Sequence, residues 1–180
     1  MKRVLAILFV GTLLSCSNSE KVTQLQNEVN ELKQQQTTKM ETATKNKNSV
    51  KAFFKALEAE NADTVADLFA ENAKHINPYH SGLFPQGANG KEAIRAYWKP
   101  TFPLFDGMTF PIKELYAMED PTIVFVSYTG NITLKNNAGV YSNNYYSTFK
   151  FNDEGKITEY VEIFNPIVAA RGFGLIDKIK

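Results

Sequence analysis

The chain is poor in the residues that build disulfides and metal sites. Its 180 residues include one cysteine, Cys16, and two histidines, His75 and His80. A lone cysteine cannot form a disulfide framework within the chain. Two separated histidines and that cysteine also make a poor ligand set for a transition metal. We therefore expect no disulfide, no metal site and no other bound cofactor.

An excess of charge of one sign is also lacking, because 20 basic residues stand against 19 acidic ones and the net charge is +1. A nucleic-acid-binding protein typically concentrates basic residues on one face. The sequence also contains no glycine-rich phosphate loop before a helix and no nucleophile elbow. We therefore expect no nucleic-acid partner, and nucleotide-binding and nucleophilic-serine chemistry are poorly supported.

A long apolar segment is missing as well. The most apolar N-terminal run, residues 4–14, is shorter than the roughly 20 residues that span a bilayer. It follows the basic residues Lys2 and Arg3, as the apolar region of a secretory signal peptide does. The run ends in Leu-Leu-Ser before Cys16, which resembles a lipobox. We predict a lipoprotein signal peptide over residues 1–15 and lipidation of Cys16. The alternative is an ordinary cleaved signal with an incidental cysteine.

A lipid on Cys16 would anchor the chain to a membrane outside the cytoplasm, in the cell envelope. Removal of residues 1–15 takes away two basic residues and leaves 18 against 19 acidic ones, a net charge of −1. Ser17 after the cysteine favours the outer membrane over retention at the inner membrane. The membrane is therefore an expected partner, contacted through the lipid.

Residues 16–48 differ in composition from the rest of the chain, because they lack glycine, proline and aromatic residues. Four apolar residues recur there at spacings of three and four, on one stripe of a helix. They are Val22, Leu25, Val29 and Leu32. Two heptads are fewer than the three or four typical of a coiled coil. The pattern favours a partly helical tether, and the alternative is a weak oligomerisation zipper.

Residues 49–180 are aromatic-rich and long enough to bury a core as one domain. Helical spacing predicts helices beginning at the N-cap Ser49, over residues 63–71 and over residues 90–98. A brief strand is expected at residues 75–78. Four longer segments rich in β-branched and aromatic residues predict strands. These are residues 110–118, 122–134, 140–152 and 156–165. The order indicates an α+β domain, with helices on one face of a curved antiparallel sheet that encloses a cone for a small ligand.

Particular segments carry a resemblance to a known family. Phe-Ala-Glu-Asn-Ala at residues 69–73, Asn77-Pro78 and Gly-Lys-Glu-Ala-Ile at residues 90–94 resemble the SnoaL-like branch of the nuclear transport factor 2-like superfamily. That superfamily includes ketosteroid isomerases and polyketide cyclases. Glu-Ile-Phe-Asn-Pro at residues 162–166 is similar to the phenazine-biosynthesis protein A/B family. The resemblance covers about residues 50–175. It implies a cone-shaped, cystatin-like fold with three N-terminal helices on a curved antiparallel sheet, and pairing of two copies through the sheet.

The resemblance also implies roles for particular residues. In the phenazine family, the carboxylate before that Asn is an acid/base group, and Glu162 stands at the matching place. A helix histidine is its partner in the family, and Tyr97 stands there in this chain. A small hydroxyl one turn later corresponds to Thr101. Because the histidine is replaced, phenazine synthesis is not carried over to this chain.

The residues around Glu162 leave two environments open for it, and the resemblance favours the pocket. The two-residue period of a strand puts Tyr160 and Phe164 on the same face as Glu162. A carboxylate among aromatic rings in a concave pocket is poorly solvated and suited to holding a proton. The alternative is a carboxylate on the solvent face, for which Glu159 is the better candidate.

Further candidates come from strand parity and helix position. His75 and Asn77 share parity and could supply a base and a donor, or be packed residues without a chemical role. Tyr97 and Trp98 line the pocket mouth or belong to the core. Tyr145 and Tyr146 point to opposite faces, so at most one lines the cavity.

These features predict a lipid-anchored domain that binds a small apolar or cyclic molecule. The expected activity is cofactor-independent acid/base catalysis of the isomerase, cyclase or lyase type. The catalytic candidates are Glu162, His75 and Tyr97. The ligand-binding candidates are Asn77, Trp98, Thr101, Tyr145, Tyr160 and Phe164. The alternative is a ligand-binding or protein-interaction lipoprotein without catalysis, including a homodimer formed through the sheet.

Overall fold

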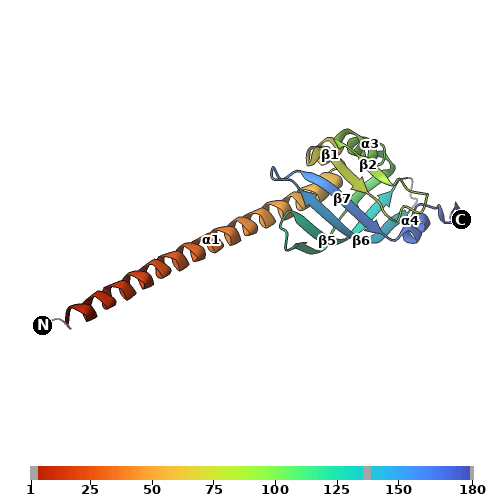
Figure 1. The fold of residues 1–180 in the computed structure, drawn as a ribbon. Coiled ribbons are helices and arrows are strands. Elements are labelled where there is room, and N and C mark those ends of the chain that lie inside the picture. The colour runs from red at the N-terminus through yellow and green to blue at the C-terminus, as the bar shows by residue number, and fades with distance from the viewer. Residues whose placement is uncertain (1–3, 136–138, 179–180) are drawn as a thin grey trace. The chain divides into compact units, whose positions relative to one another are not determined.

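The computed structural model describes residues 4–135 and 139–178, with side chains from residue 19 onward (Figure 1). It divides into two units, residues 1–41 and 42–180. The predictions for residues 1–3 and for the side chain of Cys16 lie outside this description. No helix among the described residues combines the length and the apolar character needed to cross a membrane.

Helix α1 (Val4–Glu58) is continuous. From residue 12 to its end at Glu58 the helix contains no glycine or proline, the residues that most often break a helix. The prediction that a helix begins at Ser49 is therefore wrong. Ser49 lies inside α1, where its Oγ donates to the carbonyl oxygen of Lys45 at 3.3 Å, a bond available to serine within a helix. The apolar stripe of Val22, Leu25, Val29 and Leu32 is exposed on α1.

The predicted α+β class is confirmed in residues 42–180, where the end of α1 and three short helices accompany a curled seven-stranded sheet. Helix α2 (Ala62–Asp67) is capped by Asn61, whose side chain accepts from the backbone N–H of Thr64. Helix α3 (Lys91–Trp98) follows Gly90. The strands are β1 (Phe69–Ile76), β2 (Gly87–Asn89), β3 (Phe105–Thr109), β4 (Ile112–Ala117), β5 (Ile123–Leu134), β6 (Gly139–Phe151) and β7 (Ile157–Phe164).

The sheet order is β2-β1-β7-β6-β5-β3, and β4 also pairs with β5. The pairs are antiparallel except β1 with β7, which run parallel and make the sheet mixed. This parallel pairing accounts for an error at residues 69–71, which were predicted as helix. Phe69 instead begins β1 and pairs with Ile157, because tertiary pairing overrides local helical spacing.

The chain after β7 forms helix α4 (Pro166–Gly172), which the sequence analysis did not predict. Its signals are present in the sequence. Asn165 caps the helix by accepting from the backbone N–H groups of Ile167 and Val168, and Pro166 follows at the first helical position. Two single turns of 3₁₀ helix, Phe102–Leu104 and Ile176–Lys178, complete the elements.

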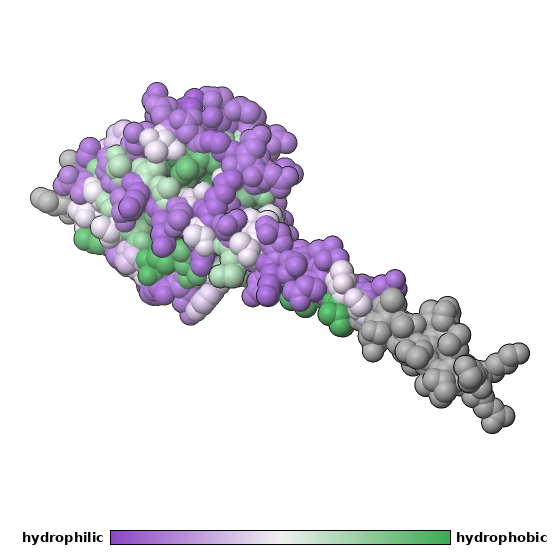
Figure 2. Space-filling model, turned by 90° about the vertical axis from the view of Figure 1, so that its left-hand side faces the viewer, coloured by the Kyte–Doolittle hydropathy of each residue, from purple (hydrophilic) through white to green (hydrophobic). Residues whose placement is uncertain are grey.

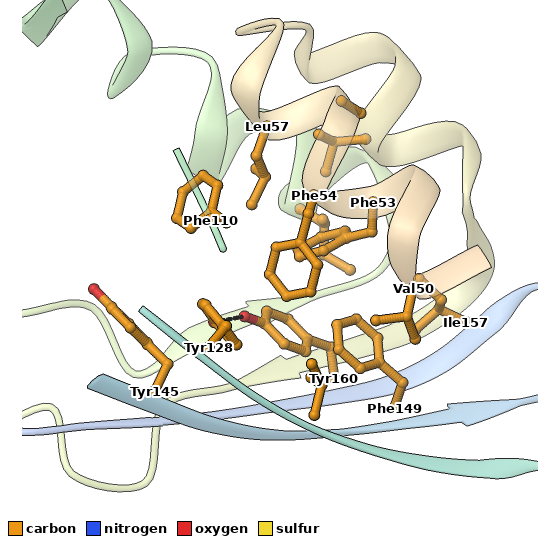
Figure 3. Close-up of a cluster of buried hydrophobic side chains, with 14 of the residues drawn as sticks. Val50, Phe53, Phe54, Leu57, Phe110, Tyr128, Tyr145, Phe149, Ile157 and Tyr160 are labelled. Carbon is orange, nitrogen blue, oxygen red and sulfur yellow. Dashed lines mark hydrogen bonds between the residues drawn. The ribbon is translucent and has the colours of Figure 1, made fainter. Parts of the chain in front are cut away.

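The core lies between the end of α1 and the concave face of the sheet (Figure 3). The ring centroid of Phe53 is 5.2 Å from that of Phe149 and 5.0 Å from that of Tyr160. The centroid of Phe54 is 4.5 Å from that of Tyr128. Aromatic rings at these separations contribute both buried area and ring–ring attraction, so α1 is fixed on the strands that carry the site.

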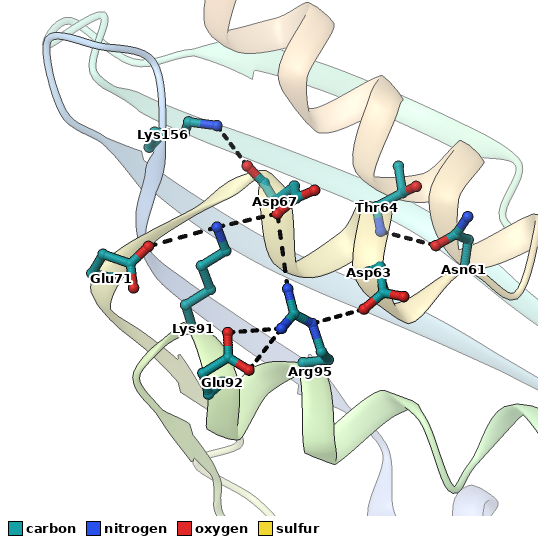
Figure 4. A network of polar contacts seen from close by, with 9 residues as sticks. All are labelled: Asn61, Asp63, Thr64, Asp67, Glu71, Lys91, Glu92, Arg95 and Lys156. Atoms are coloured by element: carbon teal, nitrogen blue, oxygen red, sulfur yellow. Dashed lines mark hydrogen bonds and ion pairs between the residues drawn. The ribbon is translucent and has the colours of Figure 1, made fainter.

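A surface network of charges joins α2 to α3 (Figure 4). Lys91 Nζ lies 3.1 Å from Asp67 Oδ1, and Arg95 Nε lies 2.9 Å from Asp63 Oδ1. Lys91 holds the pKa of Asp67 below its ordinary value, and Asp67 in turn raises the pKa of Lys91. These contacts position α3, which brings Tyr97 and Trp98 to the site.

Candidate functional site

Glu162 lies on the concave face of β7, as the resemblance implied. The residue is 8% exposed, and it pairs across the sheet with Ser147 of β6. Tyr160, two residues earlier on the same face, is fully buried. Glu159 lies on the other face, where its Oε1 is 2.7 Å from Lys150 Nζ. The two carboxylates of one strand therefore occupy different environments.

Two tyrosine hydroxyls hold one oxygen of Glu162. Tyr160 Oη donates to Oε1 at 3.0 Å, and Tyr128 Oη lies 3.4 Å from the same oxygen. The two hydroxyls are 3.0 Å apart, and Tyr128 Oη also lies 3.4 Å from Ser147 Oγ. Burial raises the pKa of both tyrosines well above the ordinary value, and the charge of Glu162 raises it further. Both phenols therefore keep their protons and can donate to the carboxylate.

His75 of β1 faces the other oxygen of Glu162. Its Nε2 lies 3.4 Å from Oε2, and its side chain is completely buried. The imidazole is stacked between Tyr160 and Trp98, with centroid distances of 4.8 and 5.8 Å, and the edge of Tyr97 lies at 4.7 Å. Neither imidazole nitrogen makes a hydrogen bond within the described part of the chain. The position of His75 depends on ring packing and on the parallel pairing with Tyr160.

Asn77 links the end of β1 to Tyr97 of α3. Its Nδ2 donates to Pro85 O and to Tyr97 Oη, each at 3.0 Å, so both amide protons are used. Tyr97 accepts this bond, and its own hydroxyl proton has no acceptor among the described residues. Burial, followed by the charge of Glu162, raises the pKa of Tyr97. Tyr97 is therefore a neutral hydrogen-bond donor beside the carboxylate.

A largely apolar cavity of about 190 Å³ opens beside these groups. Six of the residues predicted for the site line it: Tyr97, Trp98, Thr101, Tyr145, Glu162 and Phe164. The other lining residues are Leu57, Phe84, Pro85, Phe105, Met108, Phe110, Ile132, Tyr141 and Phe173. On the face of the molecule shown in Figure 2, hydrophobic residues gather within a rim of hydrophilic ones.

The remaining predicted residues lie around this lining rather than in it. His75, Asn77 and Tyr160 are buried and contact Glu162 or Tyr97. Of the two adjacent tyrosines, Tyr145 faces the cavity, whereas Tyr146 is 53% exposed. Thr101 lines the cavity, but its hydroxyl proton is donated to Tyr97 O at 2.9 Å.

Sequence reasoning missed Tyr128, Ser147 and Tyr141. The signal that could have identified them is strand parity. Ser147 is two residues from Tyr145 and Tyr141 is four, so both share its face. Tyr128 pairs with Tyr145 across β5 and β6, with its ring stacked on that of Tyr145 at 4.9 Å and 8°.

The described residues contain no group of three or more His, Cys, Asp or Glu side chains placed to hold a metal ion. The polar groups at the cavity are suited to proton transfer. The Glu162 carboxylate reaches the cavity, two phenols stabilise it, and a third phenol, Tyr97, can donate to a ligand.

Comparison with solved structures identifies the fold. A phenazine biosynthesis-related protein of Pseudomonas aeruginosa superposes with a TM-score of 0.65 at 19% identity, over 76% of this chain and 85% of that one. An epoxide hydrolase of Mycobacterium tuberculosis matches with a TM-score of 0.59 at 19% identity, over 72% and 89%. A nuclear transport factor 2-like protein of Burkholderia pseudomallei matches with a TM-score of 0.60 at 15% identity, over 71% and 95%. These likenesses show the nuclear transport factor 2-like fold.

A search of curated protein sequences finds no match to this chain. The family model described as a SnoaL-like domain matches residues 50–160, which include the end of α1, helices α2 and α3 and most of the sheet. This segment is more than half of the chain and contains His75, Tyr97 and Tyr128. The chain therefore belongs to the SnoaL-like family.

Proposed function

We propose that this SnoaL-like domain binds a small apolar or cyclic molecule and acts on it by cofactor-independent acid/base catalysis, with Glu162 as the proton-transfer group. The observation that carries the proposal is a buried carboxylate that lines an apolar cavity while two tyrosine hydroxyls hold one of its oxygens. A carboxyl group in such an apolar site is a suitable general acid or base. The names of the structural relatives, a phenazine biosynthesis-related protein and an epoxide hydrolase, are compatible with small-molecule chemistry.

The proposed reaction is proton transfer at a carbon next to a carbonyl group. Glu162 takes the proton from that carbon, and the bonding electron pair moves toward the carbonyl oxygen. Delivery of that proton from Glu162 to another carbon of the enolate completes an isomerisation. If the proton on Glu162 is first replaced by one from solvent, its delivery to the original carbon completes a hydrogen exchange. Tyr97, whose hydroxyl proton has no acceptor among the described residues, can donate to the ligand beside Glu162.

His75 acts in this proposal as a positioning residue, because it contacts Glu162 Oε2 and does not line the cavity. Oε1 is held by Tyr160 and Tyr128, so contacts on both oxygens fix the plane of the carboxylate. A base held in one orientation needs less reorganisation in the transition state.

The test uses 1-indanone, a small cyclic ketone with exchangeable hydrogens beside its carbonyl, as the probe. In D₂O, proton NMR follows loss of these hydrogens in the presence of the full chain, of Glu162→Gln and of Glu159→Gln. We expect Glu162→Gln to lower the catalysed rate by about 10²-fold or more, the size of a general-base contribution. Glu159→Gln is the matched control on the other face. Equal catalysis by wild type and Glu162→Gln would refute the role of Glu162.

The second candidate function is ligand binding without turnover, and the apolar lining of the cavity favours it. Saturation-transfer NMR would then detect 1-indanone bound to the wild type and to Glu162→Gln alike, while neither protein accelerates the exchange. Catalysed exchange by the wild type would exclude this candidate.

We also propose that the domain is attached to the cell envelope, at the outer membrane, through a lipid on Cys16. The support is the basic N-terminus, the apolar residues 4–14 and the lipobox-like sequence before the cysteine. Labelling of the full chain with a radioactive fatty acid in a bacterial host, followed by membrane fractionation, tests this. The label and the membrane association should both be lost in Cys16→Ser. An unlabelled wild-type chain would leave an ordinary signal peptide as the better interpretation.

Pairing of two copies through the outer face of the sheet is a further proposal. Tyr116, Tyr146 and Ile163 are exposed large hydrophobic residues, and the strand register places them on this face. Sedimentation of the full chain over a range of concentrations should show a dimer that Tyr146→Lys weakens. A monomer at all concentrations would contradict the proposal.

A further inference from the structure

A second polar cluster lies on the concave face of β6, beside the Glu162 site. It consists of Tyr141, Asn143 and Tyr145, which are all buried. Tyr145 pairs with Phe164 across β6 and β7, and Ser147 pairs with Glu162. Tyr145 and Glu162 are therefore diagonal neighbours on one face, a separation that long side chains can bridge. Tyr141 and Tyr145 line the same cavity as Glu162.

The hydrogen bonds of this cluster leave one hydroxyl proton without an acceptor. Asn143 Nδ2 donates to Asn165 O and to Tyr141 Oη, each at 2.9 Å, so both amide protons are used. The hydroxyl oxygens of Tyr141 and Tyr145 are 2.7 Å apart, and one of the two phenols donates to the other. Whichever donates, the other phenol keeps a proton that no described residue accepts.

Two glycines make room for these rings. A Cβ atom on Gly130 of β5 would lie 2.7 Å from Tyr145 Cε2, and one on Gly172 of α4 would lie 2.5 Å from Tyr141 Cδ2. Both distances are too short for a real contact, so any larger residue would displace a ring. The stacking of Tyr145 on Tyr128 fixes it further. The two hydroxyls are therefore held in place before any ligand binds.

The charge of the residues that line the cavity limits which ligands these hydroxyls can bind. Among the described residues that line the cavity, Glu162 is the one acidic residue, and none is Lys or Arg. An anionic ligand would meet the negative carboxylate without a compensating cation. Burial raises the pKa of Tyr141 and Tyr145, so both remain hydrogen-bond donors. The groups present match a neutral oxygen acceptor.

We propose that the Asn143–Tyr141–Tyr145 chain is a carbonyl-binding subsite, and that the ligand is a neutral cyclic ketone whose oxygen accepts the free phenolic proton. This inference rests on the proposed function, since the carbon next to that carbonyl would face Glu162. When Glu162 abstracts the proton, the released electron pair would move to the carbonyl oxygen. The subsite would stabilise that oxygen with a hydrogen bond. It therefore names the substrate class for the acid/base site.

The test compares 1-indanone with indane, which has the same ring system without the carbonyl group. Ligand-observed NMR gives the affinity of the full chain for each, and infrared spectroscopy of carbonyl-¹³C 1-indanone reports hydrogen bonding to its oxygen. We expect wild type to prefer 1-indanone by about tenfold, the worth of one hydrogen bond, and to lower its carbonyl stretching frequency. Each single variant, Tyr141→Phe or Tyr145→Phe, keeps one phenol that can donate, so the shift should persist in a weaker form.

The double variant Tyr141→Phe/Tyr145→Phe removes both donors and should lose the preference and the shift. Tyr79→Phe, at an exposed tyrosine outside the cavity lining, is the control and should behave as wild type. Gly130→Ala supplies an independent perturbation, because it displaces the Tyr145 ring without removing a hydroxyl, and it should reduce the shift. An unchanged preference and shift in the folded double variant, or equal binding of both probes by wild type, would overturn the subsite.

The two proposals can fail separately. Exchange that depends on Glu162 but a carbonyl frequency unaffected by the tyrosine variants would reject the subsite and keep the proton-transfer role. A carbonyl shift that depends on the tyrosines, without Glu162-dependent exchange, would keep the subsite and reject catalysis.

Discussion

The two faces of the sheet carry the same residue types in contrasting environments. On β7, Glu162 faces the cavity and is bound by tyrosines, whereas Glu159 faces outward and pairs with Lys150. On β6, Tyr145 is 8% exposed, whereas its neighbour Tyr146 is 53% exposed. The same residue type thus belongs to the candidate site on one face and is exposed to solvent on the other. The position of a residue relative to the pleat, rather than its identity, decides whether it belongs to the site.

The largest difference between the faces should be in stability. Phe149 on the concave face is fully buried against Phe53 and Tyr160, whereas the adjacent Lys150 points outward. Phe149→Ala leaves a cavity and should lower the free energy of unfolding by about 3–5 kcal/mol. Lys150→Ala should change it by no more than about 0.5 kcal/mol. Urea unfolding of both variants checks this, and similar losses would contradict the assignment of faces.

A smaller effect is expected for the hydroxyl groups. Tyr160→Phe removes a buried hydrogen bond to the Glu162 carboxylate and should cost about 1.5–3 kcal/mol in unfolding free energy. Tyr146→Phe removes an exposed hydroxyl and should cost no more than about 0.5 kcal/mol. Thermal and urea unfolding of the pair measure the difference. A neutral Tyr160→Phe would mean that this hydrogen bond does not stabilise the carboxylate.

Within the concave face, His75 differs from Glu162 because we assign it a positioning role and not a catalytic one. His75→Phe keeps a ring between Tyr160 and Trp98 but removes the nitrogen that faces Glu162 Oε2. We expect exchange of 1-indanone to fall by about tenfold, as for loss of one interaction with the base, with a changed pH profile. The affinity for 1-indanone should stay within about twofold. A residue needed only for packing would leave the pH profile unchanged.

The smallest expected effect lies at the surface, between α2 and α3. Because Lys91 lowers the pKa of Asp67 below 3.8, this pair contributes stability above that value. The contribution is lost as the pH falls through the lowered pKa of the folded state. The urea midpoints of wild type and Asp67→Asn should differ slightly at pH 6 and converge near pH 2, and 1 M salt should reduce the difference. A pH-independent difference would point to a cause other than this charge pair.

The period of two along strands predicted much of the site. It placed Glu162 with Tyr160 and Phe164, and His75 with Asn77, because side chains on one face are fixed once a strand exists. It also placed Tyr145 and Tyr146 on opposite faces of the sheet. It could not tell which of the two faces the cavity, since both are tyrosines. The choice depends on which face α1 covers, a tertiary property.

Other features could not be derived from local pattern. The contact between His75 and Glu162 depends on the parallel pairing of β1 with β7, which joins segments more than 80 residues apart in sequence. The bond from Tyr128 to Glu162 crosses β6 and depends on sheet curvature and ring packing. The error at Ser49 has a local cause, since a serine can cap a helix or bond within one. The helix after Asn165 was predictable from its cap.

The central claim, that Glu162 transfers protons because it faces the cavity, is tested most directly by the two glutamates of β7. The measurement is the initial rate of deuterium incorporation into saturating 1-indanone by wild type, Glu159→Gln and Glu162→Gln at equal folded concentration. We predict a rate within about twofold of wild type for Glu159→Gln and a loss of about 10²-fold or more for Glu162→Gln. Equal rates for the two variants would contradict the account.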